Sequence, residues 1–451
     1  MKDFYYKIEN LKKNPYMVFV IAFAIIIFLG AILLNLPISS NNGKSIGFVS
    51  ALFTSTSAMC VTGLTVVNTA EHWTVFGKIV ILILIQMGGL GVMSMSAMIS
   101  FLLGKKISLK TRVFIMEERN VDELQGVVRL TKSILIYTFL IEFIGAILLS
   151  FVFINDYGFD KGISFAIFHS ISAFCNAGFD VTGNSMINYV HNPIITFTIS
   201  FLVITGGIGY FVFWDMYDNK GFRKLSLHSK LVIIITGILL ILGFIFVFIL
   251  EYNNAKTLGN LSMSGKIQAS IFQSVVPRTA GFNSIEIGDL RVPTAELMII
   301  FMFIGGSSAS TAGGVKITTI GVIFISIYNF VRGKRDVEIF MKRIEHTTII
   351  KAVSIVGISM LLINVVSFIL TITEANSGFD FLDILFETVS SFGTVGLSRG
   401  LTPLLSDAGR IILSLVMFIG RLGPLTVAFA FMKQYKNIGN YTYPEGKIII
   451  G

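Results

Sequence analysis

The chain has 451 residues, of which 54% are hydrophobic and 14% are charged, and its formal net charge is +9. A mean hydropathy of +0.80 and 41 phenylalanines exceed what a water-soluble domain can bury, so the composition excludes a soluble multidomain protein and favours a lipid bilayer as the solvent. The two cysteines, Cys60 and Cys175, are too few for a disulfide framework or a metal site. We expect both to be free, buried thiols.

Eight apolar runs are long enough to cross a membrane. They cover residues 17–38, 74–103, 133–153, 194–216, 229–251, 296–330, 349–372 and 408–432. The first run lies too far from the start and is too long for a cleaved signal peptide, and no small-residue cleavage site follows it. We therefore expect it to be a permanent span, and the sequence predicts an all-α polytopic membrane protein.

Basic residues are unevenly distributed between the segments that connect these runs. Most of the Lys and Arg lie in 1–16, 104–132, 217–228, 331–348 and 433–451, whereas the alternate segments are more acidic than basic. Because basic residues accumulate on the cytoplasmic side of a membrane, this asymmetry predicts that both termini are cytoplasmic. The positive net charge then reflects membrane topology, and it does not indicate nucleic-acid binding.

Four short stretches of the chain align with one another. They are "FTSTSAMCVTGLT" from Phe53, "FHSISAFCNAGFD" from Phe168, "FQSVVPRTAGFN" from Phe272 and "FETVSSFGTVGLS" from Phe386. Each begins with Phe and reaches a glycine followed by Leu or Phe, and only the third is one residue shorter, with Pro277 inside it. Each also lies between two apolar runs, so one unit recurs in 17–103, 133–216, 229–330 and 349–432.

The apolar segments before these glycines are too short to cross a membrane. Segments such as 46–60 and 379–392 would form helices of about 20 Å, against a hydrocarbon thickness of about 30 Å. For any single copy, an ordinary turn at a glycine is a sufficient explanation. Four copies in register instead favour four re-entrant pore helices among eight spanning helices, with four glycine loops around one pore.

Backbone carbonyls of these loops are the candidate cation ligands, because a ring of carbonyl oxygens can replace the hydration shell of a monovalent cation. The candidate filter residues are Val61, Thr62, Gly63, Asn176, Ala177, Gly178, Thr279, Ala280, Gly281, Thr394, Val395 and Gly396. The fourth loop is similar to the TVGYG loop of potassium channels, but its second glycine is replaced. Thr65, Asp180, Asn283 and Ser398 occupy that position, and we expect fewer ion sites and weaker discrimination against sodium.

A second candidate site is the stretch "GGSSASTAGGVK" at 305–316, inside the sixth apolar run. Its low helix propensity predicts an unwound loop that blocks the pore, although a small-residue helix-packing face is an alternative. The candidate gate residues are Gly305, Gly306, Ser307, Ser308, Ala309, Ser310, Thr311, Ala312, Gly313, Gly314, Lys316 and Arg421. Arg421 lies in mid-span, where we expect it to bond this loop, and snorkelling to the membrane surface is the alternative. Glu142 is also in mid-span, without a predicted role.

Taken together, these features resemble the KtrB family, the membrane subunits of Ktr potassium transporters within the Trk/Ktr/HKT group. The resemblance rests on the four loops, on 305–316, on "GRLGPLT" at 420–426 and on the final "YPEGKIIIG". It implies potassium uptake across a bacterial cell membrane, often assisted by sodium, with no cofactor bound by this chain. It also implies a homodimer on a cytoplasmic regulatory ring of KtrA/KtrC type that binds ATP or ADP, with membrane lipid as the other partner and no nucleic acid.

Motifs for catalysis are missing from the sequence, including HExxH, GxSxG and zinc-type Cys/His spacing. Neither 305–316 nor "GGLG" at 88–91 has the residue order of a nucleotide-binding loop, so we expect no enzyme activity and a partner that binds any nucleotide. Loops 104–132, 217–229 and 331–348 are candidate docking segments for that partner, and the final "KIIIG" for pairing of two copies. A secondary transporter and a membrane enzyme are alternatives, and the shared polarity of the four units favours a pore.

Overall fold

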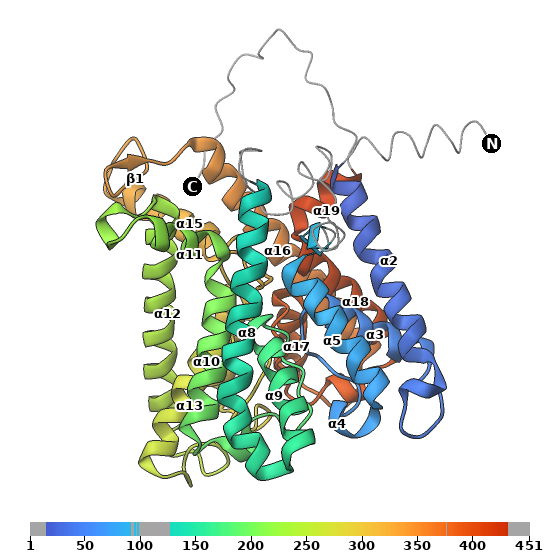
Figure 1. The fold of residues 1–451 in the computed structure, drawn as a ribbon. Helices are drawn as coiled ribbons and strands as arrows, with labels where there is room; N and C mark the ends of the chain where they lie inside the picture. Colours follow the sequence, from blue (N-terminus) through green and yellow to red (C-terminus); the bar gives the residue numbers. More distant parts are fainter. Residues whose placement is uncertain (1–14, 92–93, 96, 99–126, 376, 432–451) are drawn as a thin grey trace, which may run out of the picture.

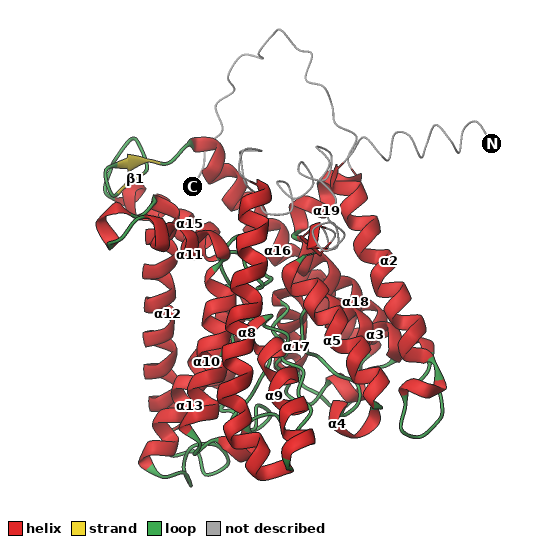
Figure 2. Ribbon diagram, viewed as in Figure 1, coloured by secondary structure: helices red, strands yellow, loops and turns green. Residues whose placement is uncertain are grey.

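The computed structural model describes residues 15–91, 94–95, 97–98, 127–375 and 377–431, which fold mainly into helices joined by loops (Figure 1, Figure 2). Four of these helices are long and apolar enough to cross a membrane. They are α2 (Pro15–Asn35), α8 (Val127–Tyr157), α12 (Leu227–Glu251) and α16 (His346–Thr373). They correspond to the first, third, fifth and seventh predicted runs.

Two further runs fold into bent helix pairs. Helices α10 (Pro193–Ile208) and α11 (Tyr210–Asp218) meet at 87°, and α18 (Asp407–Leu422) and α19 (Pro424–Phe431) meet at 95°. The bends occur at Gly209 and Gly423, whose φ angles of +97° and +87° are left-handed and suit glycine. Runs 194–216 and 408–432 therefore do not form the single straight spans that we expected.

The two remaining runs are also interrupted. Helix α5 (Val75–Leu90) ends at Gly91, beyond which most of the run 74–103 lies outside the described residues. The run 296–330 is divided into α14 (Val292–Phe303) and α15 (Ile317–Val331) by residues 304–316, which are not helical. The predicted interruption at 305–316 is confirmed, and the alternative of a small-residue helix face is excluded.

Four shorter helices lead into the glycine loops. They are α3 (Phe48–Met59), α9 (Phe159–Phe174), α13 (Met263–Val275) and α17 (Phe381–Gly393). Their 12 to 16 residues correspond to about 18–24 Å of helix, too little to cross a membrane. Helix α17 begins with a capping box, in which the side chains of Asp380 and Asp383 each accept a backbone N–H of the first turn.

The helices contact one another in a cyclic order. Each long helix packs against the short helix that follows it in sequence, as α2 does with α3, α8 with α9, α12 with α13 and α16 with α17. The next helix of each segment packs against the following short helix: α5 against α9, α10 against α13 and α14 against α17. The contact of α18 with α3 closes the circle. Four consecutive segments of the chain thus surround a common centre, where their glycine loops lie.

Smaller elements connect these helices. They are α4 (Thr69–His72), β1 (Glu338–Ile339), β2 (Lys342–Arg343) and the 3₁₀ turns Pro37–Ser39, Ile187–Tyr189, Phe222–Lys224 and Thr402–Leu404. Strands β1 and β2 form an antiparallel hairpin in the predicted docking segment 331–348. The predicted segments 1–16, 104–132 and 433–451 lie almost wholly outside the described residues, as does the final "YPEGKIIIG".

Candidate cation site

The four glycine loops converge on one another. A Cβ atom added to Gly178 would lie 2.6 Å from the Cα of Gly281, and one added to Gly63 would lie 2.5 Å from the Ala177 carbonyl oxygen. A Cβ on Gly396 would overlap the Thr62 carbonyl oxygen. Since real Cβ atoms do not approach that closely, no other residue fits at these positions without movement of a neighbouring loop.

The backbone of the four loops has the same unusual conformation. All four glycines have positive φ angles, of 95° at Gly63, 68° at Gly178, 73° at Gly281 and 91° at Gly396. The residue two positions earlier also has a positive φ, although it is not glycine, in Val61, Asn176, Thr279 and Thr394. A residue of ordinary φ separates the two in every loop. This alternation turns successive carbonyl groups toward one side of the chain, as a carbonyl-lined ion site requires.

Side chains behind the loops hold this conformation. The Ser57 and Ser390 hydroxyls accept the N–H groups of Gly63 and Gly396 at 3.1 and 3.2 Å. The second loop has Ser172 at the matching position, and its hydroxyl donates to the Phe179 carbonyl at 2.8 Å. The third loop has Val276 there and lacks this support. A hydrogen bond of 3.1 Å between the Asn176 amide and the Thr279 hydroxyl instead ties the third loop to the second.

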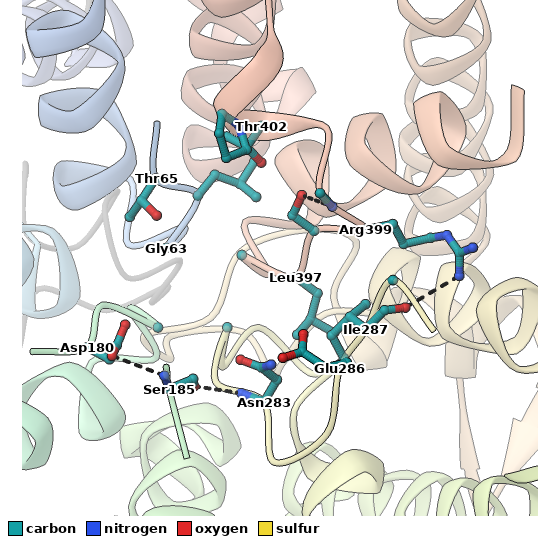
Figure 3. A pocket seen from close by; sticks show the side chains of 18 residues that line it. Gly63, Thr65, Asp180, Ser185, Asn283, Glu286, Ile287, Leu397, Arg399 and Thr402 are labelled. Atoms are coloured by element: carbon teal, nitrogen blue, oxygen red, sulfur yellow. Dashed lines mark hydrogen bonds between the residues drawn. The ribbon is translucent and has the colours of Figure 1, made fainter. Parts of the chain in front are cut away.

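A polar cavity of ≈ 350 Å³ lies against these loops (Figure 3). The four filter glycines and the four residues at the replaced second-glycine position all line it. Each of the four chain segments forms one wall of the cavity, and we number the walls in chain order. Backbone N–H groups connect the second and third walls, because the N–H of Ser185 donates to the Asp180 carboxylate at 3.1 Å and that of Asn283 donates to the Ser185 hydroxyl at 2.9 Å. Asp180 and Glu286 contribute carboxylates to the lining, which makes the cavity suited to cations.

One basic side chain, Arg399, also lines this cavity. Its Nε lies 2.6 Å from the Asp383 carboxylate, and the two side chains are only 12% and 17% exposed. Its Nη1 donates to the Ile287 and Leu290 carbonyls at 3.4 and 3.3 Å (Figure 3). Arg399 thus joins the fourth wall of the cavity to the third, with its charge balanced by Asp383.

The loop between α14 and α15, residues 304–316, lies against the opposite end of the glycine loops. The Thr311 hydroxyl donates to the carbonyl of Phe174, the last residue of α9, at 3.3 Å. A Cβ on Gly313 would overlap the Thr394 side chain. Backbone N–H groups of Ser307 and Thr311 donate to Gly207 and Gly206 at 3.0 and 3.2 Å. The loop therefore contacts the second and fourth segments as well as its own.

Arg421 and Lys316 complete the surroundings of this loop. The Arg421 guanidinium donates to the carbonyls of Thr311 and Gly88, which adds the first segment to the contacts around the loop. The Lys316 ammonium donates to the Ala312 carbonyl at 2.6 Å. Both side chains line a small cavity of ≈ 110 Å³ on the loop. The candidate gate residues thus lie together in the loop 304–316 and next to it, beside the glycine loops.

Sequence reasoning assigned no role to several buried polar groups near the loops, among them Arg278 and Glu142. Arg278, which directly precedes the third loop, is 5% exposed, and its Nη2 donates to the Thr236 hydroxyl at 3.3 Å. Glu142 had no predicted role, and its carboxylate accepts the Gln86 amide at 3.1 and 3.3 Å beside the thiol of Cys175. Both thiols are free and buried, as expected. The position of Arg278 directly before the third loop was the available signal.

Comparisons with known proteins agree with this architecture. A profile described as "TrkH: Cation transport protein" matches residues 6–439. The Ktr system potassium uptake protein B of Bacillus subtilis is 45% identical over 98% of both chains. The potassium/sodium uptake protein NtpJ of Enterococcus hirae is 40% identical over 97% of both chains, and the Ktr system potassium uptake protein B of Vibrio alginolyticus is 38% identical over 99% of this chain and 97% of that protein.

The fold is also found among solved structures. The crystal structure of the potassium transporter TrkH from Vibrio parahaemolyticus matches with a TM-score of 0.74 over 92% of this chain and 84% of that one, at 18% identity. The relatives are cation transporters and not enzymes, and the resemblance to Ktr membrane subunits is confirmed. The family profile and the close relatives together establish that the chain belongs to the TrkH family of cation transport proteins.

Proposed function

We propose that this protein takes up potassium across the bacterial cell membrane through a pore lined by the four glycine loops. The observation that carries the proposal is the convergence of Gly63, Gly178, Gly281 and Gly396 at the base of a polar cavity. In this organisation, the chain contains four units, each with two spans and one re-entrant pore helix between them, so that there are eight spans and four pore helices in total. The units are residues 17–103, 133–216, 229–330 and 349–432. The close relatives named for potassium uptake support the choice of ion.

A potassium ion arriving at the ≈ 350 Å³ cavity would exchange water for carbonyl oxygens of the loops. Carbonyl dipoles held in a fixed ring replace hydration without a reorganisation cost at each step. The C-terminal ends of α3, α9, α13 and α17 carry partial negative charge and point into these loops, which further favours a cation. Because the second filter glycine is replaced in every loop, fewer such rings form, and sodium competes or assists more readily than in a potassium channel.

The loop 304–316 is the proposed gate. It contacts the inner ends of two filter loops and is held by Arg421, so an ion leaving the filter meets backbone and the positive charges of Lys316 and Arg421. Its many glycines and hydroxyl residues allow it to adopt another conformation at low cost. A partner can open this gate only by binding more tightly to the protein with the loop displaced.

The remaining parts of the proposal concern assembly. Two copies of the chain form a dimer, and a cytoplasmic nucleotide-binding ring docks on the segments 104–132, 217–229 and 331–348. Both termini lie in the cytoplasm. The Ktr system names of several relatives support a partner component. The chain itself binds no cofactor in this proposal, and potassium, with sodium as a second ion, is its only ligand at the filter.

The test is rubidium tracer flux into proteoliposomes that contain the purified protein. We expect uptake that follows the imposed potassium gradient and is blocked competitively by external potassium. Uptake that is equally fast for rubidium and for an organic cation too large for a carbonyl ring would contradict the filter. Absence of ion flux in the presence of the complete partner complex would contradict the function itself.

A further inference from the structure

An apolar cavity of ≈ 440 Å³ lies between α8 and α11, separate from both proposed ion-conduction elements. Its lining includes Ile136, Tyr137 and Leu140 from α8 and Phe213, Trp214 and Tyr217 from α11, and none of its residues belongs to a glycine loop or to 304–316. Ile136, Leu140 and Tyr217 are 58%, 53% and 79% exposed, so the cavity is open to the outside of the helix bundle. In a membrane, such an opening faces lipid acyl chains.

Polar groups of the cavity indicate an amphipathic occupant. The hydroxyl of Tyr137 is buried and has no hydrogen-bond partner among the described residues. A buried hydroxyl without a partner is unfavourable, so an occupant with acceptor oxygens is favoured over a plain hydrocarbon. The ester groups of a phospholipid provide such oxygens next to an acyl chain.

Positive charge lies at one end of the same helix face. Arg129 and Lys132 are exposed, and their spacing from Ile136 and Leu140 places all four on one side of α8. The Arg129 guanidinium lies over the Trp214 ring at 5.7 Å from its centroid. Among the residues described, no carboxylate forms an ion pair with Arg129. A guanidinium binds phosphate in a bidentate manner, so Arg129 is suited to an anionic headgroup at this end of the cavity.

We propose that this cavity binds one anionic phospholipid, with an acyl chain between α8 and α11 and the phosphate at Arg129 and Lys132. The acyl chain is already out of water in the bilayer, so its contacts with the cavity add packing but little net hydrophobic stabilisation. Each basic side chain near an anionic lipid should favour that lipid about fivefold. The chain contribution is common to all phospholipids. The basic pair makes the site selective for an anionic headgroup.

The site is directly connected to the loop 304–316. Helix α11 begins after the bend at Gly209, and the N–H of its first residue, Tyr210, donates to the Ala309 carbonyl at 3.1 Å. A lipid bound to α11 in this arrangement stabilises the conformation in which the loop is attached to it. Anionic lipid is therefore expected to lower basal ion flux, and this last step alone rests on the proposed function.

The test uses the fluorescence of Trp214, since the chain has only one other tryptophan, Trp73, which is 1% exposed and can be replaced in Trp73→Phe. The single-tryptophan protein is reconstituted in phosphatidylcholine with increasing fractions of brominated phosphatidylglycerol or brominated phosphatidylcholine. We expect brominated phosphatidylglycerol to quench the fluorescence of Trp214 at lower lipid fractions than brominated phosphatidylcholine does. Arg129→Gln and Lys132→Gln should each reduce this preference about fivefold. Lys351→Gln, at an exposed lysine on α16, should leave it unchanged.

Several outcomes would overturn the proposal. Equal quenching by the two brominated lipids, or an unchanged preference in Arg129→Gln, contradicts a selective site. If neither lipid quenches and Leu140→Cys cross-links two copies, the cavity is a subunit interface. If Trp73→Phe misfolds, the quenching of Trp214 is obtained instead as the difference in fluorescence between the intact protein and the Trp214→Phe variant. If anionic lipid quenches Trp214 selectively but leaves the ion flux unchanged, only the link between the lipid site and the loop 304–316 is rejected. If the quenching is selective and the protein conducts no ions at all, the lipid site stands and the proposed function fails.

Discussion

The guanidinium of Arg421, near the end of α18, donates to the backbone carbonyl of Thr311 in the loop between α14 and α15. The two residues belong to the fourth and third segments of the chain, so one side chain fixes a loop contributed by a neighbouring segment. The same guanidinium also reaches the Gly88 carbonyl of the first segment. Loss of this side chain removes two contacts that hold the loop 304–316 beside the glycine loops.

Arg421→Ala is therefore expected to raise ion flux in the absence of any cytoplasmic partner, part-way toward the flux of a protein that lacks residues 307–312. Charge-assisted hydrogen bonds contribute about 1.5–3 kcal/mol each, so the loop conformation should shift by at least tenfold. The measurement is rubidium flux into proteoliposomes that contain Arg421→Ala or the variant without residues 307–312. Arg421→Lys is the matched control, because it keeps the charge and one donor. A deletion variant that reaches the membrane and still conducts only with its partner would show that the gate lies elsewhere.

Gly178→Ser and Gly396→Ser test the filter. A side chain at Gly178 meets the Cα of Gly281, and one at Gly396 meets the Thr62 carbonyl, so each substitution displaces a neighbouring loop. We expect a higher KM for potassium and a larger share of sodium uptake, measured by competition between the two ions. Gly357→Ser on α16 is the control, because a side chain there meets no other atom. If both glycine variants keep the preference for potassium over sodium unchanged, the proposal of a carbonyl filter at these loops is wrong.

Asp383 and Arg399 form the ion pair at the cavity wall, and its energetics can be isolated by a double-mutant cycle. Asp383→Asn leaves the Arg399 charge uncompensated beside the path of the cation. A nearby unit charge costs of order 1–2 kcal/mol at an effective dielectric constant of about 20, so the KM for potassium should rise roughly tenfold. Arg399→Gln combined with Asp383→Asn should restore most of the affinity. If the double variant has the same raised KM for potassium as Asp383→Asn alone, the loss of affinity comes from a structural change and not from the uncompensated charge.

Glu142 is expected to stabilise the second filter loop through its contacts with Gln86 and Cys175. Glu142→Ala leaves the half-buried Gln86 amide without this acceptor, which costs about 1 kcal/mol. Thermal unfolding in detergent should show a lower Tm for Glu142→Ala than for Glu142→Gln, which retains an acceptor oxygen. Equal Tm values for the two variants would mean that the hydrogen bonds to Gln86 contribute nothing to stability.

The long helices and the non-helical stretch 305–316 could be predicted because they depend on local composition. Apolar length alone marks α2, α8, α12 and α16, and glycines with hydroxyl residues mark the interruption. The bends at Gly209 and Gly423 were missed, although "GGIG" and "GRLG" contain the glycines that form them. The signal is ambiguous because a glycine inside an apolar helix is usually tolerated.

Other features depend on distant parts of the chain and leave no local trace. The left-handed backbone at Val61 and Thr394 is unfavourable for a residue with a Cβ, so it is imposed by the surrounding packing and not by propensity. The pairs Gln86 with Glu142 and Arg399 with Ile287 join segments that only the folded arrangement brings together. The burial of Arg278 depends on how deeply the third loop enters the bundle, which its place before that loop indicates only in part.

The four loops have different sequences although they surround one centre. In an assembly of identical subunits, any substitution changes every wall of an ion site at once. Here a single substitution changes one loop of the four directly, and the other loops respond only through their contacts with it. The third wall, with Val276 where the others have serine, is already one such departure. Under the proposed function, inequality among the four loops is a route by which the preference between potassium and sodium can be adjusted in small steps.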